Sequence, residues 1–235
     1  MRKIGFAVFL WLCGAFSVTQ ASVLYDISMN TAPLIGHPAG PFSVEFQLVD
    51  GSGAGDANNS AVLSSFALAG GSPVGGPAVK GGTTGNLSSA VNFIDSSFLN
   101  QFIQAFTPGN SLKFELSLTT NIDSGGTPDQ FSFSILDKTG SEIPTLAGAF
   151  IDVFLETDIN SANPLIQTFA SDPSRAPTGG GPPINIPAPT VTQAAVPEPS
   201  TILLLPWALV VLLGWRLRSK PSGDGWRYRG WKAKI

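Results

Sequence analysis

The chain has 235 residues, of which 43% are hydrophobic and only 12% charged, with 26 Gly and 19 Pro; this composition allows a core and favours short strands and turns over long amphipathic helices. Residues 22–196 hold 14 acidic and 4 basic residues, a balance of -10, whereas residues 216–235 hold 7 basic and 1 acidic residue, a balance of +6. The acidic balance of the central region excludes nucleic acid and anionic lipid as its partners.

The first 21 residues contain the three parts of a secretory signal peptide in the required order. Two basic residues precede an apolar run over residues 4–16, and small residues follow at Thr19 and Ala21. We therefore predict cleavage after Ala21. A retained N-terminal anchor is the weaker alternative, because a permanent membrane helix needs about 20 apolar residues.

The only cysteine of the chain, Cys13, lies within this apolar run. Lipoprotein processing is an alternative for a cysteine so placed, but it requires a small residue where this chain has Leu12. Removal of the signal peptide leaves a chain without a thiol. We therefore expect neither a disulfide nor a cysteine-ligated metal in the exported part.

Residues 22–172 are predicted to form one β-sandwich domain. Apolar residues alternate with other residues in three runs that start at Phe42, Leu112 and Phe131, as in strands with one buried face. Further strands are expected over residues 23–29, 61–68, 90–94, 150–156 and 165–170. About eight short strands with no long helix between them favour an all-β antiparallel sandwich, of which the jelly roll is one form.

Two segments of this domain depart from the strand pattern. Five apolar residues at helical spacing predict one short helix that covers an end of the sandwich: Phe98, Leu99, Phe102, Ile103 and Phe106. Residues 70–85 hold 7 Gly and no periodic apolar residues, which predicts a surface loop.

Oxygen-bearing side chains alternate over residues 50–59, as they do in a calcium-binding loop. The candidate ligands are Asp50, Ser52, Asp56 and Asn58. The segment departs from the EF-hand pattern, which has an oxygen ligand where this chain has Ala54 and a Glu where it has Ala61. Because the same residue types build ordinary turns, calcium is a minor alternative, and we expect no metal and no cofactor.

No catalytic motif accompanies the polar residues of the domain. The only histidine, His37, falls in an expected loop, and the chain has no Gly-x-Ser-x-Gly elbow of a serine hydrolase. A glycosidase needs two carboxylates across one cleft. The glutamates available for such a pair are Glu45, Glu115, Glu142 and Glu156. We therefore predict a protein that is not an enzyme, with an extracellular carbohydrate-active hydrolase as the alternative.

The C-terminal part begins with residues 173–196, whose Pro and Gly content predicts a linker. The segment 197–218 follows, with Pro197, Glu198 and Pro199 at its start and a nearly unbroken apolar run that ends at Arg216 and Arg218. This run is at the lower length limit for a single transmembrane helix. The positive charge beyond it predicts that the tail stays in the cytoplasm and the domain lies outside. A plain membrane anchor after a stiff linker is the alternative to a sorting signal.

The order of Pro197-Glu198-Pro199, apolar helix and Arg216-x-Arg218 resembles the PEP-CTERM sorting domain of exported proteins in Gram-negative bacteria. This resemblance implies processing by an exosortase, a membrane cysteine transpeptidase, at or near the Pro-Glu-Pro motif, and delivery to the cell surface or extracellular matrix. Residues 50–59 and 128–133 also resemble parts of a family of uncharacterised PEP-CTERM proteins, which implies a β-rich export cargo. We expect association with biofilm or exopolysaccharide, with polysaccharide as the candidate ligand.

The chain continues beyond the basic cluster through residues 219–235, in which aromatic and basic residues interleave. This tail departs from the PEP-CTERM pattern, because such proteins usually end within a few residues of the cluster. A cytoplasmic tail of this composition suits anionic lipid headgroups. An incidental extension that is discarded with the anchor is the alternative.

Overall fold

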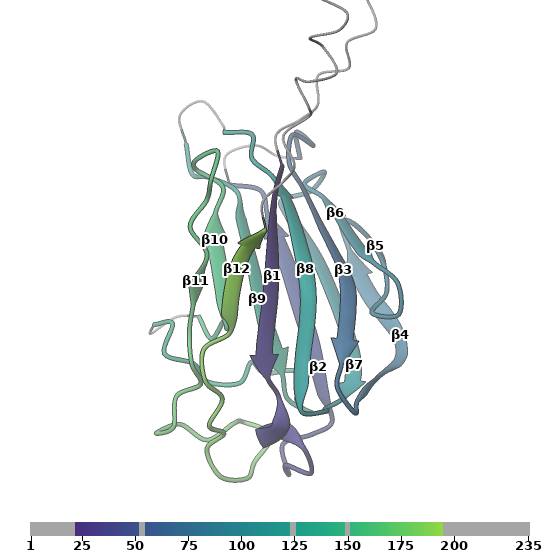
Figure 1. Cartoon of the computed structure of the whole chain (residues 1–235), viewed down its shortest axis with the longest axis vertical. Helices are drawn as coiled ribbons and strands as arrows, with labels where there is room; N and C mark the ends of the chain where they lie inside the picture. Colours follow the sequence, from purple (N-terminus) through teal and green to yellow (C-terminus); the bar gives the residue numbers. More distant parts are fainter. Residues whose placement is uncertain (1–21, 52–54, 123–125, 149–150, 195–235) are drawn as a thin grey trace, which may run out of the picture. The chain divides into compact units, whose positions relative to one another are not determined.

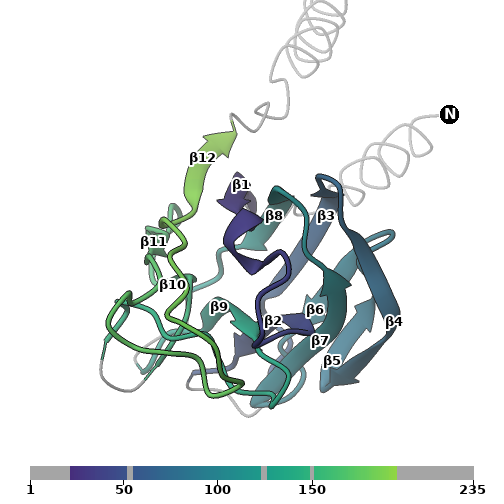
Figure 2. The ribbon, with the colours of Figure 1, turned by 90° about the horizontal axis from the view of Figure 1, so that it is seen from below.

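The computed structural model describes residues 22–51, 55–122, 126–148 and 151–194. These residues form two six-stranded antiparallel sheets and one 3₁₀ helix, η1 (Ala32–Leu34) (Figure 1). Figure 2 shows the two sheets as layers packed face to face. The prediction of an all-β fold with two antiparallel sheets is therefore confirmed. No helix in these four stretches is long and apolar enough to cross a bilayer, and the apolar run 202–217 lies outside them.

Each sheet combines strands from distant parts of the sequence. The first sheet contains, in spatial order, β12 (Thr190–Ala194), β1 (Ser22–Asn30), β8 (Ser111–Thr119), β3 (Ser60–Leu68), β6 (Val91–Ile94) and β5 (Gly82–Gly85). The second contains β11 (Gln167–Thr168), β10 (Leu155–Asp158), β9 (Gln130–Leu136), β2 (Phe42–Val49), β7 (Leu99–Thr107) and β4 (Ser72–Lys80).

The core lies between the sheets because the central strands alternate apolar and polar residues. In β8 every second side chain, from Leu112 to Leu118, is buried. The β2 residue Phe46 lies among aromatic rings from both sheets, with its ring centroid 5.0 Å from that of Phe133 and 5.3 Å from that of Phe114. Full burial of one such side chain contributes about 1.5–3 kcal/mol of hydrophobic free energy.

The short helix expected near residues 98–106 is not present, because this segment forms strand β7 between β2 and β4. The spacing of four between Phe102 and Phe106 places both on one face of a strand as well as on one stripe of a helix. The period of two was hidden because the neighbouring inward positions are the polar residues Asn100 and Gln104. Asn100 Nδ2 donates to a β2 carbonyl at 3.1 Å, and Gln104 Oε1 accepts a backbone N–H before β6 at 2.9 Å.

The glycine-rich segment 70–85 is not a loop, because it contains the strands β4 and β5. Strand β4 forms the edge of the second sheet and pairs with β7 through its backbone, with a bulge between Val74 and Ala78. Most of its side chains are exposed, so the strand needs no apolar alternation. Sequence periodicity reports the burial of side chains and therefore misses a strand of this kind.

Most of the expected linker 173–196 belongs to the sandwich. Ile184 and Ile186 are buried in the core, and the Ser171 hydroxyl donates to the Ile184 carbonyl at 2.7 Å. The segment ends in β12, which pairs with β1 so that Val191 is opposite Ile27. Proline restricts the backbone conformation of a segment, but it does not prevent the side chains of that segment from packing in the core. The domain boundary predicted at residue 172 is therefore wrong, and the folded unit reaches residue 194.

At one end of the sandwich the buried residues are polar instead of apolar. Each of them lies two positions from the last buried apolar residue of one of five strands. We call these five buried residues the end layer: Asp50, Asn59, Asp95, Thr120 and Asp129. In the first sheet, Ala61 of β3 is paired with Leu118 of β8 and Phe93 of β6. The same register, extended by two residues, places Asn59 between Thr120 and Asp95. The pairing of β2 with β9 likewise aligns Asp50 with Asp129 in the second sheet.

The end layer is connected through Asn59. Its backbone N–H donates to Asp95 Oδ2 at 2.8 Å, and its side-chain Nδ2 donates to Asp129 Oδ2 at 2.8 Å. Burial raises the pKa of Asp95 to about 7. The hydrogen bond from the Asn59 N–H lowers this pKa, whereas the adjacent Asp129 carboxyl raises it further. The layer therefore opposes the presence of two ionised carboxylates side by side.

Candidate functional site

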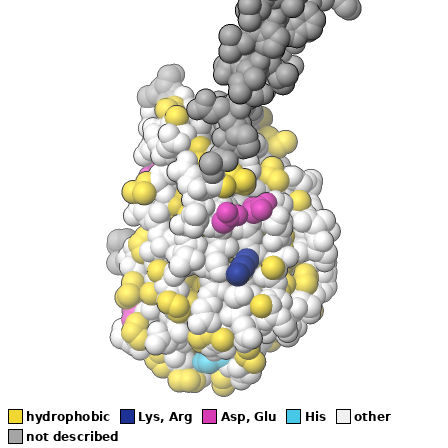
Figure 3. All heavy atoms as spheres, viewed as in Figure 1, with side chains coloured by type: hydrophobic (Ala, Val, Ile, Leu, Met, Phe, Trp, Pro, Cys, Tyr) yellow, Lys and Arg dark blue, Asp and Glu magenta, His cyan; other side chains and the backbone are white. Residues whose placement is uncertain are grey.

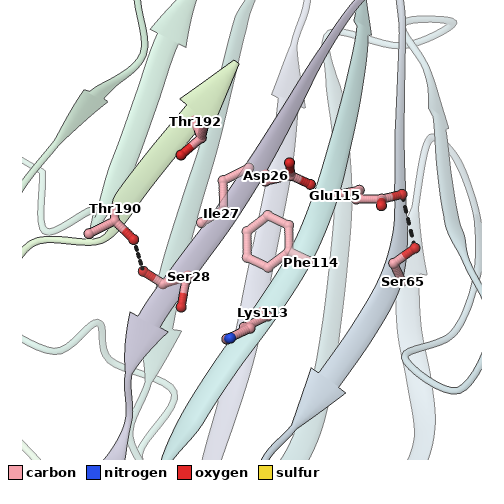
Figure 4. A pocket seen from close by; sticks show the side chains of 9 residues that line it. All are labelled: Asp26, Ile27, Ser28, Ser65, Lys113, Phe114, Glu115, Thr190 and Thr192. Atoms are coloured by element: carbon pink, nitrogen blue, oxygen red, sulfur yellow. Dashed lines mark hydrogen bonds between the residues drawn. The ribbon is translucent and has the colours of Figure 1, made fainter. Parts of the chain in front are cut away.

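A groove of about 310 Å³ lies on the outer face of the first sheet, where β12, β1, β8 and β3 run side by side (Figure 4). Figure 3 shows acidic side chains next to a basic one in the middle of this face, surrounded by uncharged residues. The polar side chains that line the groove are Asp26, Ser28, Ser65, Lys113, Glu115, Thr190 and Thr192.

The strand register decides which of these side chains are neighbours. Asp26 of β1 is directly opposite Glu115 of β8 on one side and Thr192 of β12 on the other. Two residues along, Ser28 is opposite Lys113 and Thr190. Two polar rows therefore cross the groove, one with two carboxylates and a hydroxyl and the other with an ammonium group and two hydroxyls.

A β-bulge in β3 supplies one further hydroxyl to the groove. The pairing of β3 with β8 shifts between Ser64 and Ala67, and Ser65 has a φ of 56°, in the left-handed region that non-glycine residues rarely adopt. The Ser65 hydroxyl donates to Glu115 Oε2 at 2.9 Å, and that of Ser64 approaches the same oxygen at 3.3 Å. Bulges commonly redirect a side chain in this way. The bulge orients the Glu115 carboxylate, and among the described residues no hydrogen bond reaches its second oxygen.

The charges of the groove are only partly compensated. Like charges at directly opposed positions of a sheet repel one another, as Asp26 and Glu115 do here. Within the described stretches, neither Asp26 nor Lys113 has a side-chain hydrogen bond, and the single ion pair joins Arg175 to Asp152. These groups therefore retain their capacity to bind a ligand.

The four glutamates considered for a glycosidase pair do not share one cleft. Glu115 lies in the groove, whereas Glu45, Glu142 and Glu156 belong to the second-sheet side of the sandwich. Glu45 and Glu142 are close, because Ser134 is opposite Glu45 in the sheet and its hydroxyl donates to Glu142 Oε1 at 3.3 Å. Glu45 is buried, and its Oε1 accepts the side-chain amides of Gln47 and Gln101.

Burial raises the pKa of the Glu142 carboxyl, with the N–H of Asp152 lowering it and the charge of Glu45 raising it further. Burial also raises the pKa of Glu156, and the nearby Asp158 adds to this effect. Glu45, the carboxylate close to Glu142, is buried and held by side-chain amides, which favours a structural role for these two residues.

The residues of the calcium-loop prediction lie in different surroundings. Asp50 is buried in the end layer, and its Oδ2 accepts the N–H of Gly55 at 2.6 Å. Asp56 is exposed and accepts hydrogen bonds from the backbone and side chain of Asn58 at 3.2 and 2.8 Å. Ser52 lies outside the described residues. In the part of the chain that the structure describes, no group of three or more His, Cys, Asp or Glu side chains could hold a metal ion.

His37 lies in a turn after η1, as expected, and is half-buried. Its Nδ1 accepts the N–H of Ala39 at 3.2 Å, and its Nε2 lies 3.1 Å from the carbonyl of Pro182. These contacts connect the turn to the segment that precedes β12. They give the side chain a structural role.

The residues expected to direct export and sorting lie outside the described part of the chain. They are Ala21, Pro197, Glu198, Pro199, Arg216 and Arg218. Strand β1 begins at Ser22, directly after the predicted signal-peptide cleavage site.

Sequence reasoning missed the groove because its residues come from four strands. Asp26 and Ser28 alternate with buried residues in β1, as Lys113 and Glu115 do in β8, and each pair alone is typical of an ordinary solvated sheet face. The repeated acidic and hydroxyl side chains at outward positions were the only signal. Comparisons with protein-family models, with curated proteins and with solved structures found no match to this chain.

Proposed function

We propose that this chain is a non-enzymatic exported protein of the cell surface or extracellular matrix, sorted by an exosortase-type system, and that its sandwich binds polysaccharide in the groove of the first sheet. The observation that carries the ligand assignment is the pair of polar rows, in which carboxylates, hydroxyls and one ammonium group face outward together. The export assignment rests on the sequence features at the two ends of the chain.

The groove presents the chemistry that recognises neutral or basic sugars. A carboxylate such as Asp26 accepts hydrogen bonds from neighbouring sugar hydroxyls, and Lys113 and Thr190 donate to ring and hydroxyl oxygens. Charge-assisted hydrogen bonds of this kind are about twice as strong as those between neutral groups. The groups stand on strands, so binding requires little ordering of the protein.

The strand order supports the same proposal by analogy. The series β1-β8-β3-β6 in one sheet and β2-β7-β4 in the other corresponds to a jelly roll with additional strands at the edges. Lectin domains are among the proteins that use the jelly roll. A fold alone does not determine function, so the binding assignment depends on the groove.

A binding measurement with paired variants tests the ligand assignment. The full chain, purified in detergent, should bind a subset of neutral or amino-sugar polysaccharides on a glycan array. Asp26→Asn and Lys113→Gln should each weaken this binding at least about tenfold, which corresponds to about 1.4 kcal/mol. The control Asp158→Asn removes the same charge on the second sheet and should bind like the wild type. Equal binding by all four proteins would exclude the groove as the site.

Replacement of Pro197, Glu198 and Pro199 by Ala tests the sorting assignment. The apolar run remains after this change, so the variant should stay in the membrane as an uncleaved precursor with residues 219–235 attached. An antibody against this tail, applied to membrane and surface fractions, detects the precursor. If wild type and variant both keep the tail in the same fraction, the segment is a plain anchor.

An extracellular carbohydrate-active hydrolase is the second candidate, and the opposition of Asp26 and Glu115 is the observation that favours it. Directly opposed residues have Cβ atoms about 4.5–5.5 Å apart, which is compatible with the carboxylate separation of about 5–5.5 Å in retaining glycosidases. The release of new reducing ends from a bound polysaccharide, lost in Glu115→Gln while binding persists, would favour this candidate.

A further inference from the structure

At the end layer, a pair of buried carboxyl groups connects the two sheets. Asp95 follows β6 of the first sheet, and Asp129 precedes β9 of the second sheet. Two residues from each, the rings of Phe93 and Phe131 pack edge to face across the core, with their centroids 6.3 Å apart. Asp95 is fully buried, and Asp129 is 2% exposed. The two carboxyl groups lie within hydrogen-bonding reach of one another, so they meet across the interface between the sheets.

The two carboxyl groups of this pair differ in their hydrogen bonds. Asp129 Oδ1 accepts the N–H of Gly51 at 2.9 Å, and Asp129 Oδ2 accepts the side-chain amide of Asn59 at 2.8 Å. Asp95 Oδ2 accepts the backbone N–H of Asn59 at 2.8 Å, whereas Asp95 Oδ1 is buried without a hydrogen-bond partner. The hydrogen bonds therefore suit an ionised Asp129 and leave Asp95 short of a donor.

Asn59 cannot supply the missing donor. Its side-chain Nδ2 also donates to the Asn121 carbonyl at 2.9 Å, so both hydrogens of the amide are used. A buried carboxylate oxygen without a donor is costly, because it has lost its hydration and gained nothing in return. A proton on Asp95 removes this charge and makes the group a donor. The acceptor within its reach is Asp129.

The charged residues that act on Asp95 are acidic. They are Asp129 and Asp56. Asp50, which follows β2, is the third carboxylate of the end layer. Within the described stretches, the single ion pair includes none of these residues. Two adjacent carboxylates in a buried site disfavour the ionisation of both, so one of them keeps a proton.

We propose that one proton held by Asp95 joins its carboxyl group to the Asp129 carboxylate and fastens the two sheets at this end, and that loss of this proton loosens the end reversibly. The segments joined by this contact lead out of β6 in the first sheet and into β9 in the second. The contact is closed in acid and loosened in alkali. It is separate from the groove and does not depend on the proposed function.

The pKa of Asp95 gives the direction and the range of this effect. Burial raises this pKa from the ordinary value of 3.8 to about 7, against the hydrogen bond from Asn59 and together with the Asp129 carboxyl. The folded state therefore holds the proton more tightly than the unfolded state. The stabilisation is complete in acid, and it is lost as the pH rises through about 7.

An NMR titration of the full chain in detergent tests the protonation of Asp95. In the wild type, the side-chain carboxyl carbon of Asp95 should titrate with a midpoint at about pH 7. In Asp56→Asn the midpoint should be lower, because the charge of Asp56 favours the protonated form. A wild-type midpoint near the ordinary value of 3.8 would overturn the proposal.

Amide hydrogen exchange measures the loosening of the end. The N–H groups of Asn59 and Gly51 donate to Asp95 and Asp129. Their protection, corrected for the intrinsic exchange rate, should fall about tenfold between about pH 6 and about pH 8.5. The N–H of Leu116, in the middle of β8, should keep its protection.

Asp95→Asn assigns the loosening to this proton. The variant keeps an oxygen that accepts the Asn59 N–H and gains an amide that can donate to Asp129, so its protection should be equal at both pH values. The matched control Asp26→Asn removes an exposed carboxylate from the first sheet and should show the fall of the wild type. Equal falls in the wild type and Asp95→Asn would assign the change to another group and overturn the proposal. If Asp95→Asn does not fold, the wild-type titration decides.

Discussion

At the residue scale, identical residue types have different roles according to the side of the sheet they face. Asp26 and Glu115 face outward and line the groove, whereas Asp95 and Asp129 face inward and close one end of the core. An outward carboxylate is solvated and open to a ligand. A carboxylate that faces the core requires hydrogen-bond donors, a proton or a cation. The direction of a side chain, set by the strand period of two, therefore decides its chemistry.

Glu142 should give the protein a defined dependence of stability on pH. Its pKa is raised by burial above the ordinary value of 4.5, so the folded state holds the proton more tightly than the unfolded state. The wild type should therefore lose stability as the pH rises from about the ordinary value through the raised pKa, and the loss should then stay constant. Glu142→Gln does not titrate. Its free energy of unfolding relative to the wild type should therefore increase over this window.

Urea unfolding of both proteins from about pH 4 to 8 measures this difference. The sign follows from the direction of the pKa shift alone. A difference that is constant across the range would mean that Glu142 has the same pKa in the folded and unfolded states.

Phe46 should be among the most sensitive apolar positions of the core. It is fully buried and contacts rings from both sheets. Phe46→Ala should therefore lower the free energy of unfolding by about 3–5 kcal/mol. Phe98, next to β7, is 67% exposed. Phe98→Ala should therefore change the free energy of unfolding by no more than about 0.5 kcal/mol. Comparable losses for both variants would support a buried helix at residues 98–106 instead of strand β7.

At the element scale, the segment before β12 is part of the domain although its composition resembles a linker. Its isoleucines fill the core, and the Ser171 side chain bonds to the carbonyls of Ile184 and Ile186 at 2.7 and 3.3 Å. Strand β12 then covers the free edge of β1 and supplies Thr190 and Thr192 to the groove. The groove therefore depends on a segment that the sequence predicts to lie outside the domain.

Ile186→Ala tests the contribution of this segment. The side chain is fully buried, so its truncation should cost about 2–5 kcal/mol of unfolding free energy. The same substitution at Ile122, which is 59% exposed, is the matched control and should have little effect. Chemical denaturation of the three proteins provides the comparison. If Ile186→Ala lowers the free energy of unfolding no more than Ile122→Ala does, the segment is a linker and not part of the domain.

At the scale of the whole molecule, the folded unit fits between the predicted targeting segments. Strand β1 starts at Ser22 and β12 ends at Ala194, so processing after Ala21 and near Pro197 would remove no strand of the sandwich. Export of the sandwich as one unit stays a prediction of the sequence features at the two ends of the chain.

The mature protein should therefore begin at Ser22. Intact-mass measurement of the chain isolated from its native host determines this terminus, because a signal peptidase cuts after the small residue that closes its motif. Release of the first 21 residues should leave the melting temperature of the sandwich unchanged, since β1 remains whole. A mature chain that still starts at Met1 would exclude secretion by this route.

The fold class and the central strands could be predicted from the sequence alone. The alternation in β1, β2, β8 and β9 reflects burial of one face, which is a local property that a single segment displays. The same principle fails for β4, because its side chains are exposed and its backbone pairing with β7 has no local sequence signal. It also fails for β7, where the inward Asn100 and Gln104 conceal the alternation.

Which polar residues meet depends on the pairing of strands and the packing of the sheets. Asp26 faces Glu115 because β1 pairs with β8 across 89 positions in the sequence, and the bulge at Ser65 orients that glutamate. Asp95 meets Asp129 because two sheets close on each other at one end. The repeated pattern of an acidic residue two positions from an apolar core residue, as in Phe93-x-Asp95 and Asp129-x-Phe131, was visible in the sequence. Its meaning depended on register and sheet packing, which are nonlocal and therefore absent from the periodicity of any one strand.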